Sequence, residues 1–336
     1  MKLNSLLPLL GEEVSAPDEE TFDLFSQNLP SQSLGFVDSK STTLELTIGG
    51  RDLTIHQSPG VLSSNRAGGT TGAVVWNITP LFAEWISSAN NLFFSHEILS
   101  TSSFVLELGC GISGLVGLLL APRITQYVLS DQVYVARFVE QNIVENQPRQ
   151  QLKQQRKTKG GSNKNRSSSN QQSSSSFDAG GAGKIRFAAL DWETDQVTPS
   201  LTGVPEAKSF DVVVACDCVY NLGLIEPFVT TCADACRLRA SSSFSSSSSS
   251  ELEPGGRGEG EGEQEEPPCV CIVAQQLRDP IVFEAWLESF AKSFHVWRVP
   301  DELLLEGLRS NSGFVVHMGV LKASKLSVGL EGSNIQ

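Results

Sequence analysis

Residues 104–120 read FVLELGCGISGLVGLLL, and this stretch decides the fold class. Residues 104–108 form a short apolar run that is typical of a buried β-strand. Glycines follow at positions 109, 111 and 114, and the apolar residues 115–120 then begin a helix. Glycines make a tight turn possible and let a ligand approach the backbone closely. The order of strand, glycine turn and helix therefore predicts a ligand-binding turn at the edge of a sheet.

Working outward from this turn, strands and helices alternate along the chain. Further strands are expected at 127–131, 185–190, 210–216 and 269–274, with helices beginning near 136, 224 and 280. The runs 294–299 and 314–321 lack a strong helix between them and fit a hairpin-like pair. This alternation predicts an α/β fold with a Rossmann-like, seven-stranded, mostly parallel sheet and an antiparallel end strand. Upstream, 44–48 and 53–56 flank Gly49 and Gly50, which predicts an N-terminal β-hairpin extension.

Four stretches lie outside this pattern, and three of them, 1–35, 149–183 and 240–268, contain too few apolar residues to form a core. Residues 1–35 are expected to be a partly disordered N-terminal extension, and 326–336 a C-terminal tail. The low-complexity tracts 149–183 and 240–268 are expected to be disordered insertions in surface loops. One domain is therefore predicted over 36–325, and long surface insertions add little to its loop-closure cost.

The composition limits the classes of partner. The 336-residue chain carries a net charge of −13, so it repels phosphate backbones and suits a basic protein better than nucleic acid. Its longest apolar run is too short to cross a bilayer, and the N-terminus lacks the apolar region of a secretory signal. We therefore expect a soluble, cytoplasmic protein that binds neither membranes nor nucleic acid directly.

The cysteines and histidines indicate structural roles. The seven cysteines include no Cys-x-x-Cys pair, and most lie in apolar runs, as expected for reduced core residues. No metal site is predicted. His56, His96, His295 and His317 lie beside no nucleophile motif and are interpreted as structural.

Carboxylates accompany the glycine turn and suggest its ligand. Asp131 stands at the end of the second strand, where an acid accepts hydrogen bonds from ribose hydroxyls. Glu107 precedes Gly109 by two residues, and a carboxylate there suits a cationic ligand better than a pyrophosphate. This favours S-adenosylmethionine (SAM) over NAD, although a purely structural glycine turn is the alternative.

Residues 217–220 read DCVY and follow the fourth strand, at the sheet edge where ligands bind in such folds. A lysine amine must lose its proton before it accepts a methyl group, because its free pKa is about 10.4. Asp217 is expected to hold the incoming ammonium, and Tyr220 to orient the amine. The alternative is an Asp that caps the next helix and a Tyr that packs against it. Trp192 and Trp76 are each expected to contact the cofactor, with a core or rim position as the alternative.

The motifs together resemble the seven-β-strand protein lysine methyltransferases, and among them the fungal ribosomal lysine methyltransferases. The resemblance is carried by residues 75–85, 105–115, 190–192 and 216–221, which read VWNITPLFAEW, VLELGCGISGL, LDW and CDCVYN. It implies a SAM-dependent monomer that methylates lysine on a large-subunit ribosomal protein. It also implies that Asp217 and Tyr220 face the acceptor, and that the cofactor contacts are Trp76, Gly109, Cys110, Gly111, Asp131, Trp192 and Cys216. Relatives often carry Ala at the position of Cys216, and a small residue is kept here.

Other functions stay open from the sequence alone. The enzymatic alternative is a SAM-dependent methyltransferase for a small molecule or another protein residue. A second alternative is a non-catalytic SAM-fold adaptor, although the intact 217–220 motif argues against it. An NAD(P) oxidoreductase would need a catalytic Tyr-x-x-x-Lys or a His–acid pair, and neither is found.

Overall fold

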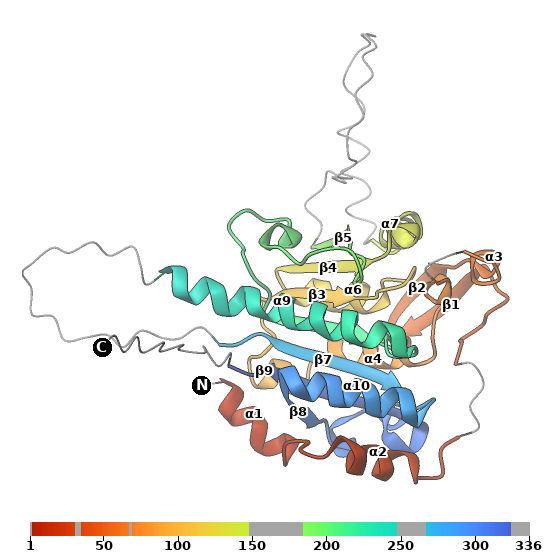
Figure 1. The fold of residues 1–336 in the computed structure, drawn as a ribbon. Helices are drawn as coiled ribbons and strands as arrows, with labels where there is room; N and C mark the ends of the chain where they lie inside the picture. The colour runs from red at the N-terminus through yellow and green to blue at the C-terminus, as the bar shows by residue number, and fades with distance from the viewer. Residues whose placement is uncertain (1, 31–34, 67–68, 148–183, 247–266, 324–336) are drawn as a thin grey trace, which may run out of the picture.

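The computed structural model describes residues 2–30, 35–66, 69–147, 184–246 and 267–323, and a seven-stranded sheet forms its centre (Figure 1). The strands are β3 (Phe104–Leu108), β4 (Gln126–Asp131), β5 (Ile185–Ala189), β6 (Val212–Cys216), β7 (Val270–Gln276), β8 (Phe294–Arg298) and β9 (Phe314–Leu321). Their order is β5-β4-β3-β6-β7-β9-β8, so β3 lies next to both β4 and β6. This agrees with the α/β, Rossmann-like sheet predicted from the sequence.

The sheet is parallel except for one strand. Strands β3, β4, β5, β6 and β7 pair in parallel, whereas β9 is antiparallel to both β7 and β8. The edge strand β8 therefore runs in the same direction as β7. The expected hairpin-like pair of the last two strands is confirmed, but the reversed strand lies one place in from the edge.

Two apolar layers cover the sheet because successive residues of each strand face opposite sides. On β3, Val105 packs into one layer, and Leu106 and Leu108 pack into the other. The first layer includes α4 (Ile78–Ser87), α6 (Leu115–Leu120) and α7 (Ala136–Glu145). The second includes α9 (Ile225–Ser246) and α10 (Pro280–Ser293), which lie side by side on the near face in Figure 1. Both faces of the sheet are thus buried.

The predicted hairpin is present and is attached to the first layer. Strands β1 (Thr43–Ile48) and β2 (Arg51–His56) pair in antiparallel fashion through the Gly49–Gly50 turn, where both glycines have positive φ. Short elements join the main ones. They are the helices α3 (Pro59–Leu62) and α5 (Leu92–Ser95), and the 3₁₀ turns η1 (Thr71–Ala73), η2 (Ala121–Arg123), η3 (Val133–Val135), η4 (Pro199–Thr202), η5 (Leu222–Leu224), η6 (Asp301–Leu303), η7 (Glu306–Leu308) and η8 (Ser310–Ser312).

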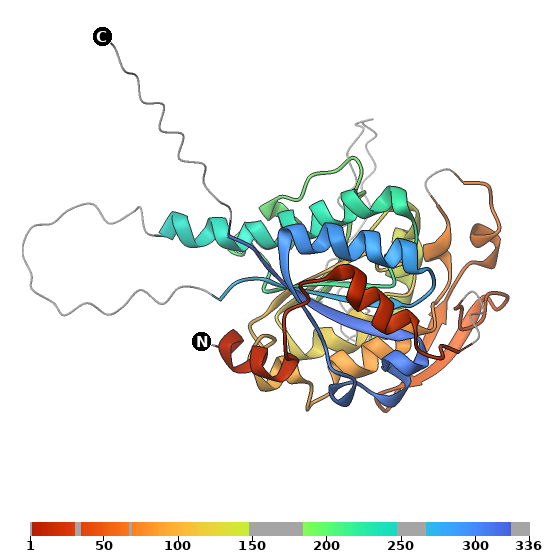
Figure 2. The ribbon, with the colours of Figure 1, turned by 60° about the horizontal axis from the view of Figure 1, so that its bottom comes forward.

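The expected N-terminal extension contains regular structure. Its described residues 2–30 include two helices, α1 (Lys2–Leu10) and α2 (Pro17–Phe25). Leu24 of α2 is fully buried, and α2 packs along α10, as Figure 2 shows from below. Glu20 on the same helix pairs with the fully buried His317 of β9 and with Arg298 of β8. This segment is therefore part of the domain.

The other low-complexity stretches fall largely outside the described residues. The expected insertion at 149–183 and the tail at 326–336 lie outside them, as do residues 247–266 of the second insertion. The described part of that second stretch differs from the expected insertion beginning at 240, because α9 (Ile225–Ser246) continues into it. In the part of the chain that the structure describes, we find no helix with both the length and the apolar character needed to span a bilayer.

Candidate functional site

The carboxyl ends of β3, β4, β5 and β6 meet at one edge of the sheet, and a cavity of 450 Å³ lies there. All the residues that the sequence analysis assigned to the site line this cavity: Trp76, Glu107, Gly109, Cys110, Gly111, Asp131, Trp192, Cys216, Asp217 and Tyr220. In particular, Asp131 and Tyr220 line the same cavity. The cavity volume lies within the range typical of small-molecule sites.

The glycine loop brings the backbone close to its neighbours. Gly109, Gly111 and Gly114 all have φ between +57° and +68°, a region that side chains other than glycine rarely adopt. A Cβ atom on Gly109 would lie 2.6 Å from Cys218 Sγ and 3.1 Å from the Trp192 ring. Glycine at position 109 therefore permits the backbone conformation of the turn and leaves part of the cavity unfilled.

Glu107 is a buried carboxylate on β3, with 2% of its surface exposed. Tyr127 on the adjacent strand donates a hydrogen bond of 2.8 Å from its hydroxyl to Glu107 Oε2. Burial raises the pKa of Glu107 to about 8; the Tyr127 hydrogen bond opposes this rise, and the charge of Asp131 adds to it. Much of Glu107 is therefore protonated at neutral pH, and a cation in the cavity would favour its charged form.

Asp131 ends β4 and is fastened to the glycine loop. The backbone N–H of Gly111 donates to Asp131 Oδ2 at 2.8 Å, and that of Gln132 donates to Oδ1 at 2.7 Å. Burial raises the pKa of Asp131 to about 6, although these two bonds and the charge of Arg66 favour the carboxylate. Each oxygen keeps a further acceptor position, as recognition of a diol requires.

Two tryptophans line the cavity. Trp192 follows β5 and packs on Phe228, with ring centroids 5.1 Å apart, and its buried Nε1 has no hydrogen-bond partner among the described residues. Trp76 is held by a 3.0 Å bond from its Nε1 to the carbonyl of Thr71, and by a contact with Phe36. An unpaired donor at a cavity wall is costly unless a ligand satisfies it.

The 217–220 motif adopts an arrangement that the sequence did not reveal. Asp217 has a positive φ of 61°, and both of its carboxylate oxygens accept hydrogen bonds from Arg278. Tyr220 is 40% exposed at the cavity, and burial of the rest of the side chain raises the pKa of its phenol. A hydrogen bond to Thr71 opposes that rise. Asp217 thus faces a guanidinium within the protein.

Sequence reasoning missed several residues around the cavity. Gly72 accepts a hydrogen bond from the Ile112 N–H at 2.8 Å, and a Cβ on Gly72 would lie 2.9 Å from the hydroxyl of Tyr134. The run GGTTG at 68–72 was the available sign of a close backbone approach. Arg278 carried no such sign, because it lies 61 residues beyond Asp217.

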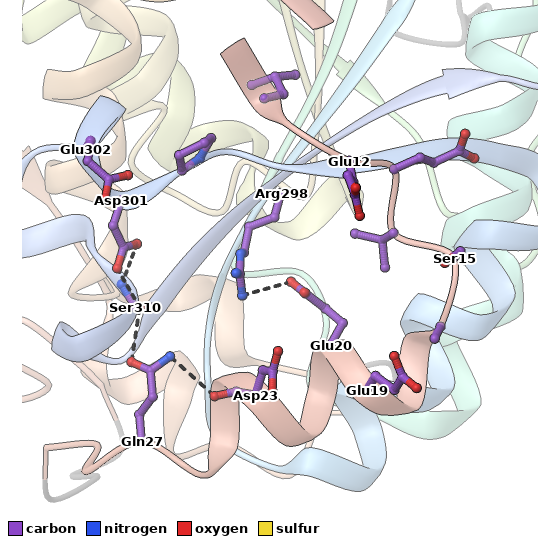
Figure 3. Close-up of a pocket in the computed structure, with 15 residues that line it drawn as sticks. Glu12, Ser15, Glu19, Glu20, Asp23, Gln27, Arg298, Asp301, Glu302 and Ser310 are labelled. Carbon is purple, nitrogen blue, oxygen red and sulfur yellow. Dashed lines mark hydrogen bonds and ion pairs between the residues drawn. The ribbon is translucent and has the colours of Figure 1, made fainter. Parts of the chain in front are cut away.

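A second cavity of 470 Å³ lies between α2 and the chain around the end of β8 (Figure 3). Its walls carry many acidic side chains: Glu12, Glu13, Glu19, Glu20, Asp23, Asp301 and Glu302. Several are held within the protein. Glu20 pairs with Arg298 at 3.3 Å, and Asp301 accepts a bond of 2.6 Å from the hydroxyl of Ser310. None of the predicted site residues lines this cavity.

Comparison with known proteins agrees with the resemblance. Residues 56–174 match the model of a family described as lysine methyltransferase. The chain is 31% identical over 195 residues to ribosomal lysine N-methyltransferase 5 of Zygosaccharomyces rouxii, covering 54% of this chain and 59% of that protein. It is also 35% identical over 130 residues to a diaminohydroxyphosphoribosylamino-pyrimidine deaminase of Schizosaccharomyces pombe, covering 38% of this chain and 31% of that protein.

Among solved structures, the N-methyltransferase NodS of Bradyrhizobium japonicum, in complex with S-adenosylhomocysteine (SAH), matches with a TM-score of 0.33 and 13% identity. This match covers 70% of this chain and 90% of that chain. The predicted resemblance to the lysine methyltransferases is confirmed by the family match and by the Z. rouxii relative. The chain spans only part of either curated relative, 59% of one and 31% of the other.

Proposed function

We propose that this chain is a SAM-dependent protein-lysine N-methyltransferase that acts on a ribosomal protein of the large subunit. One observation carries the cofactor assignment: Glu107 is buried and Asp131 half-buried at the cavity, and among the described residues no cationic side chain is bonded to either carboxylate. Such a cavity favours a cationic ligand and disfavours the pyrophosphate of NAD.

The residues present fit SAM. Asp131 offers acceptors for ribose hydroxyls, and Glu107 places beside the loop a carboxyl group whose charged form a bound cation would favour. The unpaired Nε1 of Trp192 supplies a donor at the cavity wall, and the glycines at 109 and 111 leave room for a ligand against the backbone. When bound there, SAM supplies a methyl group activated by its positive sulfonium sulfur. The protein contributes binding, orientation and exclusion of water.

We assign the binding of the acceptor lysine to the 217–220 motif. Tyr220 lies at the cavity with part of its ring exposed, where its hydroxyl can orient an amine that enters from solvent. Partial burial of a lysine there lowers its pKa and favours the neutral amine that methyl transfer requires. Positioning of the amine is the main contribution expected from these residues.

The substrate class rests on two supports. The Z. rouxii relative is a ribosomal lysine N-methyltransferase, and the net charge of −13 favours a basic protein substrate. We further propose that the chain acts as a cytoplasmic monomer. A deaminase is not proposed, because the sequence has no Cys-x-x-Cys pair of the kind that zinc deaminases use.

Methyl transfer to purified ribosomal subunits tests the proposal. The full chain is incubated with methyl-labelled SAM and separated large and small subunits, and labelled proteins are digested and analysed by mass spectrometry. The expected result is methyl-lysine in a large-subunit protein. The control is Asp131→Ala, which removes the acceptor at the loop and is expected to abolish labelling while the melting temperature shows a folded protein.

Two outcomes would replace the proposal. Label that enters only small metabolites would make the protein a small-molecule methyltransferase. Binding of SAH without transfer to any component of a whole-cell extract would favour a non-catalytic adaptor. Label in small-subunit or non-ribosomal proteins would keep the lysine chemistry and change the substrate class.

A further inference from the structure

Arg278 joins three segments that form the wall of the candidate site. Its Nη1 and Nη2 donate to the two carboxylate oxygens of Asp217, and Nη2 also donates to Gln276 Oε1 at 2.7 Å. Its guanidinium lies over the ring of Trp76, with 4.5 Å between Cζ and the ring centroid. These partners come from the end of β6, the end of β7 and the chain just before α4. One side chain thus ties together parts of the protein that are far apart in sequence.

Asp217 is committed to this contact. Its side chain is 2% exposed, whereas that of Arg278 is 22% exposed, so water screens the pair weakly. The bidentate geometry uses both carboxylate oxygens and neutralises their charge. The Gln276 N–H lies 3.4 Å from Oδ1 as a further donor. An incoming ammonium would have to displace the guanidinium to reach this carboxylate.

The backbone at Asp217 also depends on its surroundings. Its φ of 61° is a left-handed conformation that is uncommon for residues other than glycine, although Asp and Asn tolerate it best. The Asp217 N–H donates to the carbonyl of Ala274 at 2.8 Å, which links this turn to β7. The turn determines the direction in which the chain leaves β6, and therefore where Tyr220 lies relative to the cavity.

We infer that Arg278 is a positioning residue for methyl transfer, and that Asp217 acts through it and does not itself receive the substrate ammonium. This inference rests on the proposed function. The ion pair fixes the turn that leads to Tyr220, and the stacking contact fixes Trp76. The guanidinium therefore positions the part of the cavity wall beside which the acceptor amine would bind. Removal of either partner leaves an unpaired charge at a nearly buried position.

The first experiment measures methyl transfer and SAH binding in Arg278→Met and Arg278→Lys. Misplaced acceptor groups lower kcat, so we expect Arg278→Met to lose about tenfold to a hundredfold in kcat. The dissociation constant of SAH, measured by calorimetry, should change by a smaller factor than kcat, because Arg278 does not contact the glycine loop and reaches the cofactor side only through Trp76. Arg278→Lys should retain intermediate activity, since lysine pairs with a carboxylate but lacks the bidentate fork.

A double-mutant cycle tests the coupling. Asparagine tolerates the left-handed turn, so Asp217→Asn removes the charge while keeping the backbone conformation. We expect Arg278→Met and Asp217→Asn to be strongly non-additive, and the double variant to lose no more activity than either single variant. The matched control is Arg239→Met, which breaks the ion pair between Arg239 and Asp211. Asp211 directly precedes the first residue of β6, at the end of the strand away from the cavity, so this variant should leave kcat unchanged.

Different outcomes test the role of Arg278 and the proposed function separately. Additive losses, or an Arg278→Met variant that keeps wild-type activity or binds the protein substrate more tightly, would overturn the inference, because the carboxylate would then be acting alone. If Arg278→Met does not fold, Arg278→Lys and the double variant carry the same test. A wild-type chain that binds no SAH and transfers no methyl group would instead remove the proposed function.

Discussion

At the scale of single residues, Glu107 and Asp131 sit in one cavity with pKa values of about 8 and 6, both raised by burial. Neither carboxylate is bonded to a cationic side chain among the described residues. A protein without ligand therefore bears the cost of two acids that burial makes hard to ionise. A cationic ligand would offset that cost, so these residues trade stability for binding.

Replacing Glu107 with Gln tests this trade. The folded-state pKa lies above the ordinary value of 4.5, so the stability associated with this group is fully present below that value and is lost as pH rises toward about 8. Glu107→Gln cannot ionise and keeps an acceptor for Tyr127. At pH 7 the free energy of unfolding of this variant, measured by urea denaturation, should exceed that of the wild type by roughly 2 to 3 kcal/mol. Near pH 4 the two proteins should be equally stable.

The same variant should bind SAM less well. SAM affinity of the wild type should rise between pH 7 and 9 as Glu107 ionises, and Glu107→Gln should remove this rise and weaken binding by about tenfold at pH 9. SAH, whose sulfur is neutral, serves as the control and should depend less on pH. A wild-type SAM affinity that is constant from pH 7 to 9 would contradict the assignment of Glu107 to the cationic part of the cofactor.

Gly109 allows a prediction with a matched control. Gly109→Ala and Gly50→Ala both place a side chain at positive φ, which costs about 1 to 2 kcal/mol of stability in each case. Only the Cβ at 109 enters an occupied site, 2.6 Å from Cys218 Sγ, whereas the one at 50 meets nothing within 4 Å. Calorimetry should therefore show SAH binding lost in Gly109→Ala and kept in Gly50→Ala. Equal affinities would mean that the loop does not form the cofactor wall.

The residues that line the cavity could be predicted from the sequence, but the ion pairs and hydrogen bonds that they form could not. Glycines after a buried strand, and acids at strand ends, meet at one edge in any parallel sheet, so Gly109, Asp131 and Asp217 were placed correctly. The partner of Asp217 comes from beyond β7, and no local spacing relates it to the motif. The local sequence therefore gives no sign that a guanidinium already binds the Asp217 carboxylate.

At the scale of elements, patterns that repeat within one segment were predicted well. Strands β3, β4 and β5 begin and end close to the expected residues, and helix α10 begins at the expected one. The helices α1 and α2 were missed because they are short, and polar residues dominate α2. The burial of α2 comes from partners distant in sequence, such as α10 and His317. Short helices gain most of their stability from such packing, so local sequence predicts them poorly.

The docking of α2 gives a stability prediction. Leu24 is fully buried between α2 and the second layer, whereas Phe22 on the same helix is 72% exposed. Leu24→Ala should therefore lower the free energy of unfolding by about 3 kcal/mol, and Phe22→Ala should change it by less than about 0.5 kcal/mol. Urea denaturation followed by circular dichroism measures both. Equal small effects would show that α2 is not part of the folded core.

At the scale of the whole molecule, one edge of the sheet carries both the proposed cofactor site and the proposed acceptor site, on different strands. The ends of β3, β4 and β5 supply the glycine loop, Asp131 and Trp192, which form the proposed cofactor side. The ends of β6 and β7 supply Tyr220, Asp217 and Arg278, which form the proposed acceptor side. Because β3 and β6 are adjacent, the two sides share one cavity. The strand order itself therefore brings a methyl donor and an amine together.

Calorimetric titration of the 336-residue chain with SAH, with NAD as the comparison ligand, tests this arrangement most directly. We predict heat of binding that fits one SAH per chain with micromolar affinity, and no heat from NAD under the same conditions. The absence of SAH binding, or binding of NAD in its place, would contradict the claim that the carboxylates around the glycine loop select a sulfonium cofactor.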